Sequence, residues 1–417
     1  MSGGDLTLGA RRSPHGDDAR DRFDGTLPEM RDSARPINQG RLAWLNIGWV
    51  VVLSALALTL LGVAAIDTTQ PGSAVRQFAH LLVGMVLALA VAVPDYRRLR
   101  RFTWPLAILS VLLLIFVLIP MVPEEIVRPR NGARRWINFG LTDVQPSELA
   151  KIAWIALMAE WLVRRRSYRS FTGFIFTFLV TLVPFILILQ EPDLGTALLF
   201  IPTLMVMLVV AGARLWHVVL ILVIGASLGP IAYYTPGVLK PHQTARVEAI
   251  LAQIRGDDSL DSDEGFQAAR ARLVVGSGGV TGVGKDHARA LVEYNRLPEE
   301  HNDMIFAVVA CRWGLLGGSA LLGLFILFSL GCISVAANSR DAFGRLLVVG
   351  ILSMIFFQML VNTGMTIGLL PITGMTLPFV SYGGSSLVTT WIMVGIVLNV
   401  ALRRPRPMQR EAFVFED

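Results

Sequence analysis

Long apolar runs alternate with short polar connections along most of this chain. A run of about 20 apolar residues is the length that a helix needs to cross the hydrocarbon core of a bilayer. The pattern predicts ten membrane-spanning helices, at 44–66, 75–94, 104–122, 147–163, 171–189, 194–211, 215–233, 303–335, 346–367 and 380–402. The eighth is longer than a bilayer requires, so we expect it to tilt, protrude or kink near Gly314, Gly317 and Gly318.

The basic residues of the short connections indicate an orientation for these helices. With ten spans, one side of the membrane receives the N-terminus and the arginines at 97, 98, 100, 101, 164, 165, 166, 169, 214, 340, 345, 403, 404, 406 and 410. The opposite connections at 68–72, 190–193 and 368–379 contain neither Lys nor Arg. Because positive residues gather on the cytoplasmic side, we predict that both termini are cytoplasmic.

Composition agrees with a membrane protein. Hydrophobic residues make up 53% of the 417 residues and charged residues only 16%, whereas soluble proteins carry about 25% charge. We therefore expect an all-α integral membrane protein: a disordered cytoplasmic tail at 1–43, a polytopic domain at 44–402 and a second cytoplasmic tail at 403–417. A large extracytoplasmic loop at 235–302 would join the seventh and eighth helices. The net charge of +6 follows from the topology, so no nucleic-acid partner is expected.

Two pairs of charged residues stand out around the start of the fourth helix, one in the connection before it and one in its first turn. Arg134 and Arg135, beside Trp136, stand on the predicted outer side, where positive residues are disfavoured. An anionic ligand would explain them, and simple solvation is the alternative. Glu148 and Lys151 are three residues apart and share a helix face. They face either a polar cavity or one another as a structural ion pair.

Two outer segments combine turn-forming and polar residues. At Glu191-Pro192-Asp193 two carboxylates flank a tight turn, and Asp193 is placed to cap the next helix. The segment 368–386 alternates Pro and Gly with apolar residues at membrane depth. There Gly383 and Gly384 would let backbone amides approach a ligand, unless the segment is a hairpin packed through small residues.

The glycine-rich segment 276–286 partly matches a phosphate-binding loop. Gly279 to Lys285 fit G-x-x-x-x-G-K, but Asp286 stands where the Mg²⁺-binding Ser or Thr belongs, and no strand precedes the segment. We reject a nucleotide site. A backbone nest beside a pyrophosphate and a flexible re-entrant turn both stay open.

Candidate chemistry concentrates at 297–306, where Glu299, Glu300, His301 and Asp303 precede a long apolar run. Asp303 stands where water meets hydrocarbon. The histidines are scattered and show no metal-ligand spacing. Cys311 and Cys332 lie in one span, too far apart to pair within a straight helix.

These segments together resemble the SEDS family (RodA, FtsW, SpoVE). The resemblance rests on five motifs in the same order, namely Arg134-Arg135-Trp136 with Gln145-Pro146-Ser147-Glu148, Pro192-Asp193-Leu194-Gly195-Thr196, Gly276-Ser277-Gly278-Gly279, Leu297-Pro298-Glu299 with His301, Asp303 and Ile305-Phe306, and Leu377-Pro378 with Ser381-Tyr382-Gly383-Gly384-Ser385. It implies a peptidoglycan glycosyltransferase of the bacterial plasma membrane. Such an enzyme polymerises lipid II, an undecaprenyl-linked disaccharide peptide, and works with a class B penicillin-binding protein among membrane lipids.

The resemblance places the family's essential acid on Asp303, which we take as a general base for an inverting displacement. Arg134, Arg135 and Lys151 would hold the departing diphosphate. The remaining expected substrate contacts are Glu148, Asp193, His301, Ser381, Gly383 and Gly384. No cofactor is certain, although a Mg²⁺ or Mn²⁺ ion bridging diphosphate and Asp303 is compatible with this chemistry.

Two other functions stay open at this point, a lipid II flippase and a non-catalytic scaffold for a penicillin-binding protein. Family members usually carry acidic residues where this chain has Cys311 and Arg312, which is why the scaffold is retained. Cell elongation and division are not separated either, because 240–246 looks RodA-like and 131–136 looks FtsW-like.

Overall fold

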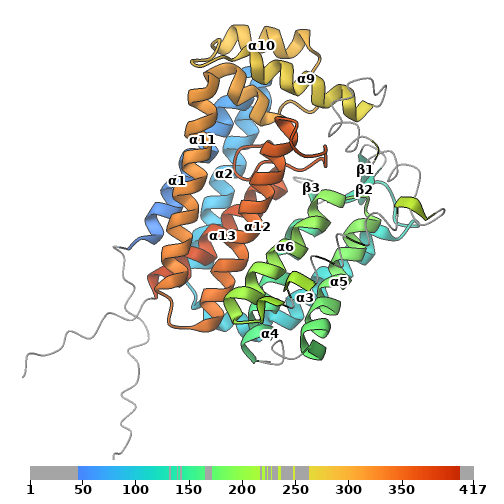
Figure 1. Ribbon diagram of the computed structural model, residues 1–417, viewed down its shortest axis with the longest axis vertical. Coiled ribbons are helices and arrows are strands. Elements are labelled where there is room, and N and C mark those ends of the chain that lie inside the picture. Colours follow the sequence, from blue (N-terminus) through green and yellow to red (C-terminus); the bar gives the residue numbers. More distant parts are fainter. Residues whose placement is uncertain are drawn as a thin grey trace, which may run out of the picture. The chain divides into compact units, whose positions relative to one another are not determined.

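The structure, a computed structural model, describes residues 46–130, 133–138, 140, 143–164, 171–216 and 263–403, with isolated positions between 218 and 248 (Figure 1). The tail expected at 1–43 lies outside the described residues, as do residues 404–417 of the tail expected at 403–417 and most of the seventh predicted span.

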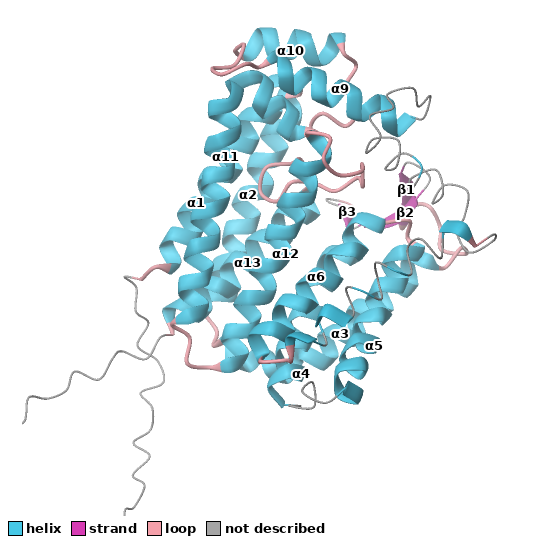
Figure 2. Ribbon diagram, in the orientation of Figure 1, coloured by secondary structure: helices cyan, strands magenta, loops and turns pink. Residues whose placement is uncertain are grey.

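Helices dominate the described part of the chain, as predicted (Figure 2). Eight are long and apolar enough to cross a membrane, and the chain is therefore a multi-pass membrane protein. The long helices are α1 (Gly48–Thr69), α2 (Pro71–Ala92), α3 (Leu99–Leu118), α4 (Pro146–Arg164), α5 (Phe171–Gln190), α6 (Leu194–Ala211), α11 (Ile305–Ala337), α12 (Ala342–Thr366) and α13 (Gly384–Leu402), with a 3₁₀ turn η1 (Tyr96–Arg98) before α3.

Helix α4 is the one long helix among the described residues that does not count among those eight candidates. It carries Glu148, Lys151 and Glu160, all three buried. Each of these charges is paired inside the protein: Lys151 with Glu148, and Glu160 with Arg100 and Arg164. Charged side chains are tolerated at membrane depth when they face the bundle interior and pair, so α4 fits the predicted fourth span.

The connection between α3 and α4 adds a small sheet to the expected all-α fold. Strands β1 (Val127–Arg130), β2 (Ala133–Asn138) and β3 (Asp143–Val144) form an antiparallel sheet in the order β1-β2-β3. Val127 and Ile137 pack with Val117 at the end of α3 in a small apolar cluster. This burial holds the sheet against the end of α3, where β2 also contacts α4 and β3 contacts α13.

The described part of the large loop is helical. Helices α9 (Asp263–Ser277) and α10 (Lys285–Tyr294) lie across the ends of α1 and α11 (Figure 1). The residues that join them, 278–284, form what we call the glycine loop. They dock on α11 at Gly314, where the helix is broken at φ 67° and ψ −161°. The predicted kink is confirmed there, and the glycine loop is a docked backbone segment with hydrogen bonds to α11.

Helix α13 runs through the interior and packs closely on α2 and α1. Small residues allow this approach. A Cβ built on Gly395 of α13 would lie 2.4 Å from the carbonyl oxygen of Ala88, and one on Gly62 of α1 would lie 2.5 Å from that of Val380. Such contacts between backbones are typical of membrane helices, which associate through close packing of small residues.

This packing predicts that Gly395→Ala destabilises the protein by about 1–3 kcal/mol, because the added methyl group must push the α2 backbone away. Thermal unfolding of the purified protein in detergent measures the effect. Gly323→Ala is the matched control, since Gly323 of α11 has open space around it. Equal midpoints for the two variants would contradict the close approach of α2 and α13.

Candidate functional site

Asp303 lies in the turn immediately before α11, and its backbone is held from two sides. Asn362 of α12 donates a hydrogen bond from Nδ2 to the carbonyl oxygen of Asp303 (2.8 Å) and another to that of Met375 (2.5 Å). Ser381 donates from Oγ to the carbonyl oxygen of Asn302 (2.6 Å). The segment 375–381 is thereby tied to the turn that carries Asp303.

Two more contacts fix the segment before α13 on the same turn. The amide of Tyr382 donates to the carbonyl oxygen of His301 (2.9 Å). Gln77 of α2 donates to the carbonyl oxygen of Ser381 (2.8 Å) and accepts from the amide of Gly383 (3.2 Å). Irregular backbone at this depth needs such partners, because water is not available to supply them.

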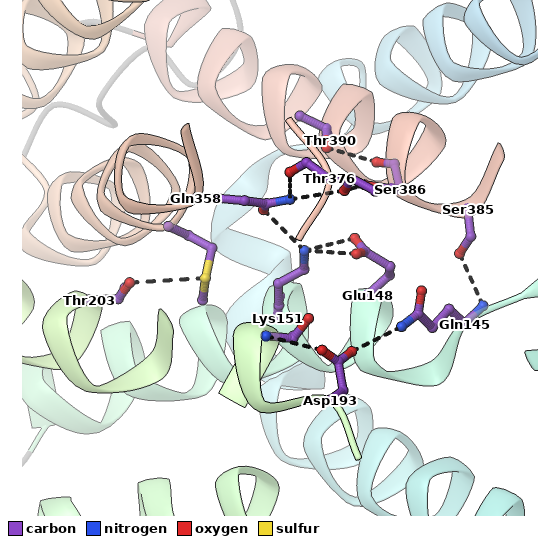
Figure 3. Close-up of polar contacts among 12 residues, drawn as sticks. Gln145, Glu148, Lys151, Asp193, Thr203, Gln358, Thr376, Ser385, Ser386 and Thr390 are labelled. Atoms are coloured by element: carbon purple, nitrogen blue, oxygen red, sulfur yellow. Dashed lines mark hydrogen bonds and ion pairs between the residues drawn. The ribbon is translucent and has the colours of Figure 1, made fainter. Parts of the chain in front are cut away.

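The buried ion pair of α4 connects to the same region through α12 (Figure 3). Lys151 lies 2.9 Å from Glu148, and Nζ also donates to Oε1 of Gln358 (3.4 Å). Gln358 in turn donates to the carbonyl oxygen of Thr376 (2.9 Å). Gln358 and Asn362 are one helical turn apart, so one face of α12 links the Glu148–Lys151 pair to the turn of Asp303.

The two adjacent arginines of β2 lie on different sides of the strand, because successive side chains of a strand alternate. Arg134 donates to the carbonyl oxygens of Pro120 (2.9 Å) and Val122 (2.5 Å), just after α3. Arg135 donates to the carbonyl oxygens of Glu191 (2.6 Å) and Pro192, between α5 and α6. Only Arg135 therefore reaches the region of Asp303.

The turn between α5 and α6 brings a second carboxylate to the site. Asp193 caps α6, as predicted, by accepting from the amide of Thr196 (3.2 Å). Its other oxygen accepts from the side-chain Nε2 of Gln145 (3.2 Å). The backbone amide of Gln145 donates to Oγ of Ser385 (3.1 Å) (Figure 3). The Asp193 carboxylate is thus fixed by α6 and by the start of α4.

Burial and like charges raise the pKa of Asp303 to about 7. Loss of water around the carboxyl group is the largest cause, and the charges of Glu299 and Asp193 add to it. Arg135 and His301 act in the opposite direction. A carboxyl group with this pKa exchanges its proton near neutral pH, as a general base must.

Glu191, which we did not select from the sequence, is a second unusual carboxyl group. Burial, followed by the charge of Asp193, raises its pKa to about 9, although Arg135 opposes the shift. Neither carboxyl oxygen has a hydrogen-bond partner among the described residues. Glu191 is therefore neutral at pH 7 and adds no negative charge beside Arg135.

A polar and aromatic group covers the other side of the turn. The ring of Tyr382 lies 5.7 Å from that of His301 and 6.4 Å from that of His80. Glu300 accepts from Gln70 (3.1 Å), and its hydrogen bonds hold the pKa of its carboxyl group below the usual range. Gly384 lies against the ring of His80, where a Cβ would come within 2.9 Å.

The structure thus gathers most of the predicted residues around one turn. Asp303 and His301 belong to this turn, and Ser381 is hydrogen-bonded to Asn302 within it. Gly383 follows Tyr382, whose amide donates to His301, and Arg135 and Asp193 act on the Asp303 charge. Glu148 and Lys151 connect through Gln358, and Gly384 starts α13 next to His80. Arg134 braces the connection after α3 instead.

Arg312, which replaces an expected acid, points to α1. Its guanidinium donates to the carbonyl oxygen of Ala64 (2.5 Å) and to Oγ1 of Thr68 (2.9 Å), and it stacks on Trp313. Cys311 is buried beside Ser277. The Arg312 guanidinium is therefore held by α1. Arg312 is not among the residues whose charges shift the pKa of Asp303.

The side-chain amides of Gln77, Gln358 and Asn362 were not identified from the sequence. Each lies in an otherwise apolar or ordinary helical pattern. A buried amide inside a membrane helix is a signal that could have found Gln358 and Asn362, because such residues rarely face lipid. Their partners are backbone groups of distant segments, which no spacing rule identifies.

Within the part of the chain that the structure describes, no group of three or more His, Cys, Asp and Glu side chains is arranged to hold a metal ion. Asp303 and Asp193 are close enough for their charges to interact. Mg²⁺ is commonly bound by one or two carboxylates together with substrate phosphates, so Asp303 and Asp193 are the carboxylates of this site that could contribute to holding such an ion.

Fold and site together define a multi-pass α-helical membrane protein with a titratable acid at the end of its helices. Comparisons with known proteins give the family. A family model for FtsW, RodA and SpoVE, described as cell cycle protein, matches residues 39–405. The chain belongs to this family, the SEDS proteins.

Several characterised proteins and solved structures are similar over nearly their whole length. Stage V sporulation protein E of Bacillus subtilis is 36% identical, over 86% of this chain and 94% of the relative. A probable peptidoglycan glycosyltransferase FtsW of Coxiella burnetii is 33% identical, over 86% of this chain and 97% of that protein. The peptidoglycan glycosyltransferase RodA of Treponema pallidum is 29% identical, over 86% of this chain and 98% of that protein.

A chain from a structure of a peptidoglycan synthase complex, which coordinates polymerization and crosslinking, matches with a TM-score of 0.74 and 32% identity. The match covers 86% of this chain and 98% of that one. The crystal structure of the rod shape determining protein RodA of Thermus thermophilus matches with a TM-score of 0.62 and 28% identity, covering 87% and 99%.

The site predicts that Asp303 reacts with the hydrophobic reagent dicyclohexylcarbodiimide in a pH-dependent way. The reagent modifies protonated carboxyl groups, so labelling should be high at pH 6 and should fall as the pH rises through about 7. Glu191 should keep reacting until about pH 9. Peptide mass spectrometry locates the label, and Asp303→Asn removes it from that position. Labelling of Asp303 that has already vanished at pH 6 would contradict the raised pKa.

Proposed function

We propose that this protein is a peptidoglycan glycosyltransferase that polymerises lipid II into glycan strands at the outer face of the bacterial plasma membrane. One observation carries the proposal: a carboxyl group with a pKa of about 7, Asp303, stands beside Arg135 at the start of α11. The glycosyltransferase names of the FtsW and RodA relatives support it. The activity serves cell elongation or division.

The reaction that fits this site joins an acceptor hydroxyl to an anomeric carbon and releases a lipid diphosphate. Asp303 takes the hydroxyl proton as the new bond forms. An ordinary Asp, with a pKa near 3.9, is a weak base for this step. Burial beside Glu299 and Asp193 makes Asp303 a stronger base while it is still ionised in a large fraction of molecules at pH 7.

Positive charge stabilises the departing diphosphate. Arg135 is the arginine whose charge acts on Asp303, and the neutral side chain of Glu191 does not compensate the charge of Arg135. Lys151 lies deeper and is paired with Glu148, so we assign the pair to shaping the inner wall of the site. A single displacement with one base and no covalent intermediate inverts the configuration at the anomeric carbon.

The remaining groups orient the substrate or the base. His301 lies on the turn of Asp303, and Ser381 is hydrogen-bonded to that turn at Asn302. Gly383 and Gly384 follow in the same segment, where Gln77 holds the amide of Gly383. Asp193 sits across from Asp303, and a Mg²⁺ or Mn²⁺ ion held by both would supply further positive charge to the diphosphate. Arg134 contributes by holding the sheet that presents Arg135.

We also propose a class B penicillin-binding protein as partner, because a similar chain was solved within a peptidoglycan synthase complex that couples polymerization to crosslinking. A flippase or a scaffold would use the same fold with no need for a base of this pKa.

Replacement of Asp303 separates these functions. Asp303→Asn should reduce polymer formation from lipid II by about 100-fold or more, the upper part of the range for loss of a general base. The assay uses the purified full-length protein with its penicillin-binding protein in liposomes, followed by gel analysis of the glycan strands. Glu293→Gln, on the exposed face of α10, is the control.

Polymer formation by Asp303→Asn at the wild-type rate would rule out the proposed base and leave the scaffold. Transport of labelled lipid II by the protein alone, unaffected by Asp303→Asn, would support the flippase instead.

The pKa of Asp303 predicts the pH dependence of the reaction. The base acts only when ionised, so the rate at saturating lipid II should rise with pH through about 7. Glu299→Gln removes a charge that raises this pKa, so the rise should occur at lower pH. The ratio of rates at pH 6 and pH 8 measures the shift, and Glu293→Gln should leave the ratio unchanged. An identical profile for Glu299→Gln and wild type would contradict the electrostatic assignment.

A further inference from the structure

Helix α11 is interrupted shortly after Asp303. In a continuous helix the amides of Leu315 and Leu316 would donate to the carbonyl oxygens of Cys311 and Arg312. The left-handed conformation of Gly314 breaks both of these bonds. Four backbone groups therefore need other partners, because an unpaired backbone group that is buried away from water costs free energy.

The glycine loop supplies all four partners. Two of its amides donate into the break, from Val283 to the Cys311 oxygen (3.0 Å) and from Gly284 to the Arg312 oxygen (3.2 Å). Two of its carbonyl oxygens accept, that of Gly279 from the amide of Leu315 (2.9 Å) and that of Val280 from the amide of Leu316 (3.1 Å). The loop thus replaces one turn of the hydrogen-bond ladder of α11.

This replacement requires glycine at two loop positions. A Cβ on Gly278 would lie 2.0 Å from the carbonyl oxygen of Ala310, and one on Gly282 would lie 2.2 Å from that of Arg312. Gly282 also has φ +85°, which disfavours other residues. In both cases the obstacle is backbone, so no rotation of a side chain can relieve the clash.

The break leaves a short proximal segment of α11, residues 305–313, with Asp303 directly before it. Asn362 and Ser381 hold its beginning through the backbone of Asp303 and Asn302. The glycine loop holds its end. The position of the proximal segment, and with it the position of the Asp303 carboxylate, is therefore set by contacts at two places.

We propose that the glycine loop is a positioning element for Asp303, which fixes the proximal segment of α11 so that the carboxylate meets the substrate. The proposal rests on the proposed role of Asp303 as the base. The glycine loop, which the sequence also allowed as a phosphate-binding nest, thereby receives the role of holding α11 in place. Gly278 and Gly282 are positioning residues in this scheme and do not touch the substrate.

Docking of the loop can be measured without any activity assay. Cys311 is fully buried under the docked loop, and Cys332 is buried deeper in the same helix. Gly282→Ala should increase the rate at which a water-soluble maleimide labels Cys311, while Cys332 stays unlabelled. Gly276→Ala is the matched control, because Gly276 lies in α9 with open space around it.

Positioning is then tested by catalysis. A displacement of the base by about 1 Å costs up to roughly 100-fold in rate. Gly282→Ala should lower kcat for lipid II polymerisation by about 10- to 100-fold with KM changed less than about twofold, and it should move the pH at which kcat rises. A role in folding alone would lower the yield of protein and leave the pH profile of the folded fraction unchanged.

A reversible lock provides a second variant that does not depend on the folding of Gly282→Ala. Oγ of Ser277, at the end of α9, lies 3.5 Å from Sγ of Cys311. In Ser277→Cys a disulfide between positions 277 and 311 would hold the loop in its docked state. The oxidised variant should polymerise like the wild type, because the disulfide holds the loop where the structure already places it.

Three results would overturn the proposal. The first is equal labelling of Cys311 in Gly282→Ala and Gly276→Ala, and the second is increased labelling of Cys311 in Gly282→Ala with unchanged kcat and pH profile. The third is a loss of activity on oxidation of Ser277→Cys that a reductant reverses. Failure of the proposed function looks different, since the wild-type protein itself would then form no polymer.

Discussion

Unpaired backbone groups are prohibitively costly where water is excluded, and the described site is built around this constraint. Each interruption of helix near Asp303 is repaired by a segment from elsewhere in the chain. The break in α11 is filled by the glycine loop, and the irregular stretch before α13 is held by Gln77, Gln358 and Asn362. These repairs leave the turn of Asp303 with few ways to move.

The same exclusion of water determines the charge state of the site. Asp303 and Glu191 both lose hydration, and Arg135 opposes the rise in pKa of both. His301 also acts on Asp303, and the pKa is raised to about 7 at Asp303 and to about 9 at Glu191. Two carboxyl groups in one neighbourhood thus differ in protonation at pH 7. In the proposed reaction the first acts as the base, and the second adds no negative charge beside Arg135.

Membership of the SEDS family agrees with this electrostatic arrangement. The relatives that match over nearly their whole length carry glycosyltransferase names, and the most similar of the solved chains described above comes from a peptidoglycan synthase complex. A base with a pKa near 7 has a purpose in glycosyl transfer, whereas a passive scaffold has no need of one. The replacement of an acid by Arg312 does not conflict with activity, because that side chain pairs with α1.

Hydrophobic periodicity by itself determined the helical membrane fold, most of the span positions, the kink at Gly314 and the location of Asp303 at the end of a span. These features depend on local length and composition, which a sequence displays directly. The small sheet, the opposite directions of Arg134 and Arg135, and the docking of the glycine loop were decided only by the tertiary structure. The strands of the sheet are neighbours in the chain, but the contacts of Arg135 and the docking of the glycine loop depend on backbone groups far from them in the chain, and backbone groups are the same in every residue. The sequence therefore indicated Asp303 as the candidate base, and only the tertiary packing decided its burial and the charges that act on its pKa.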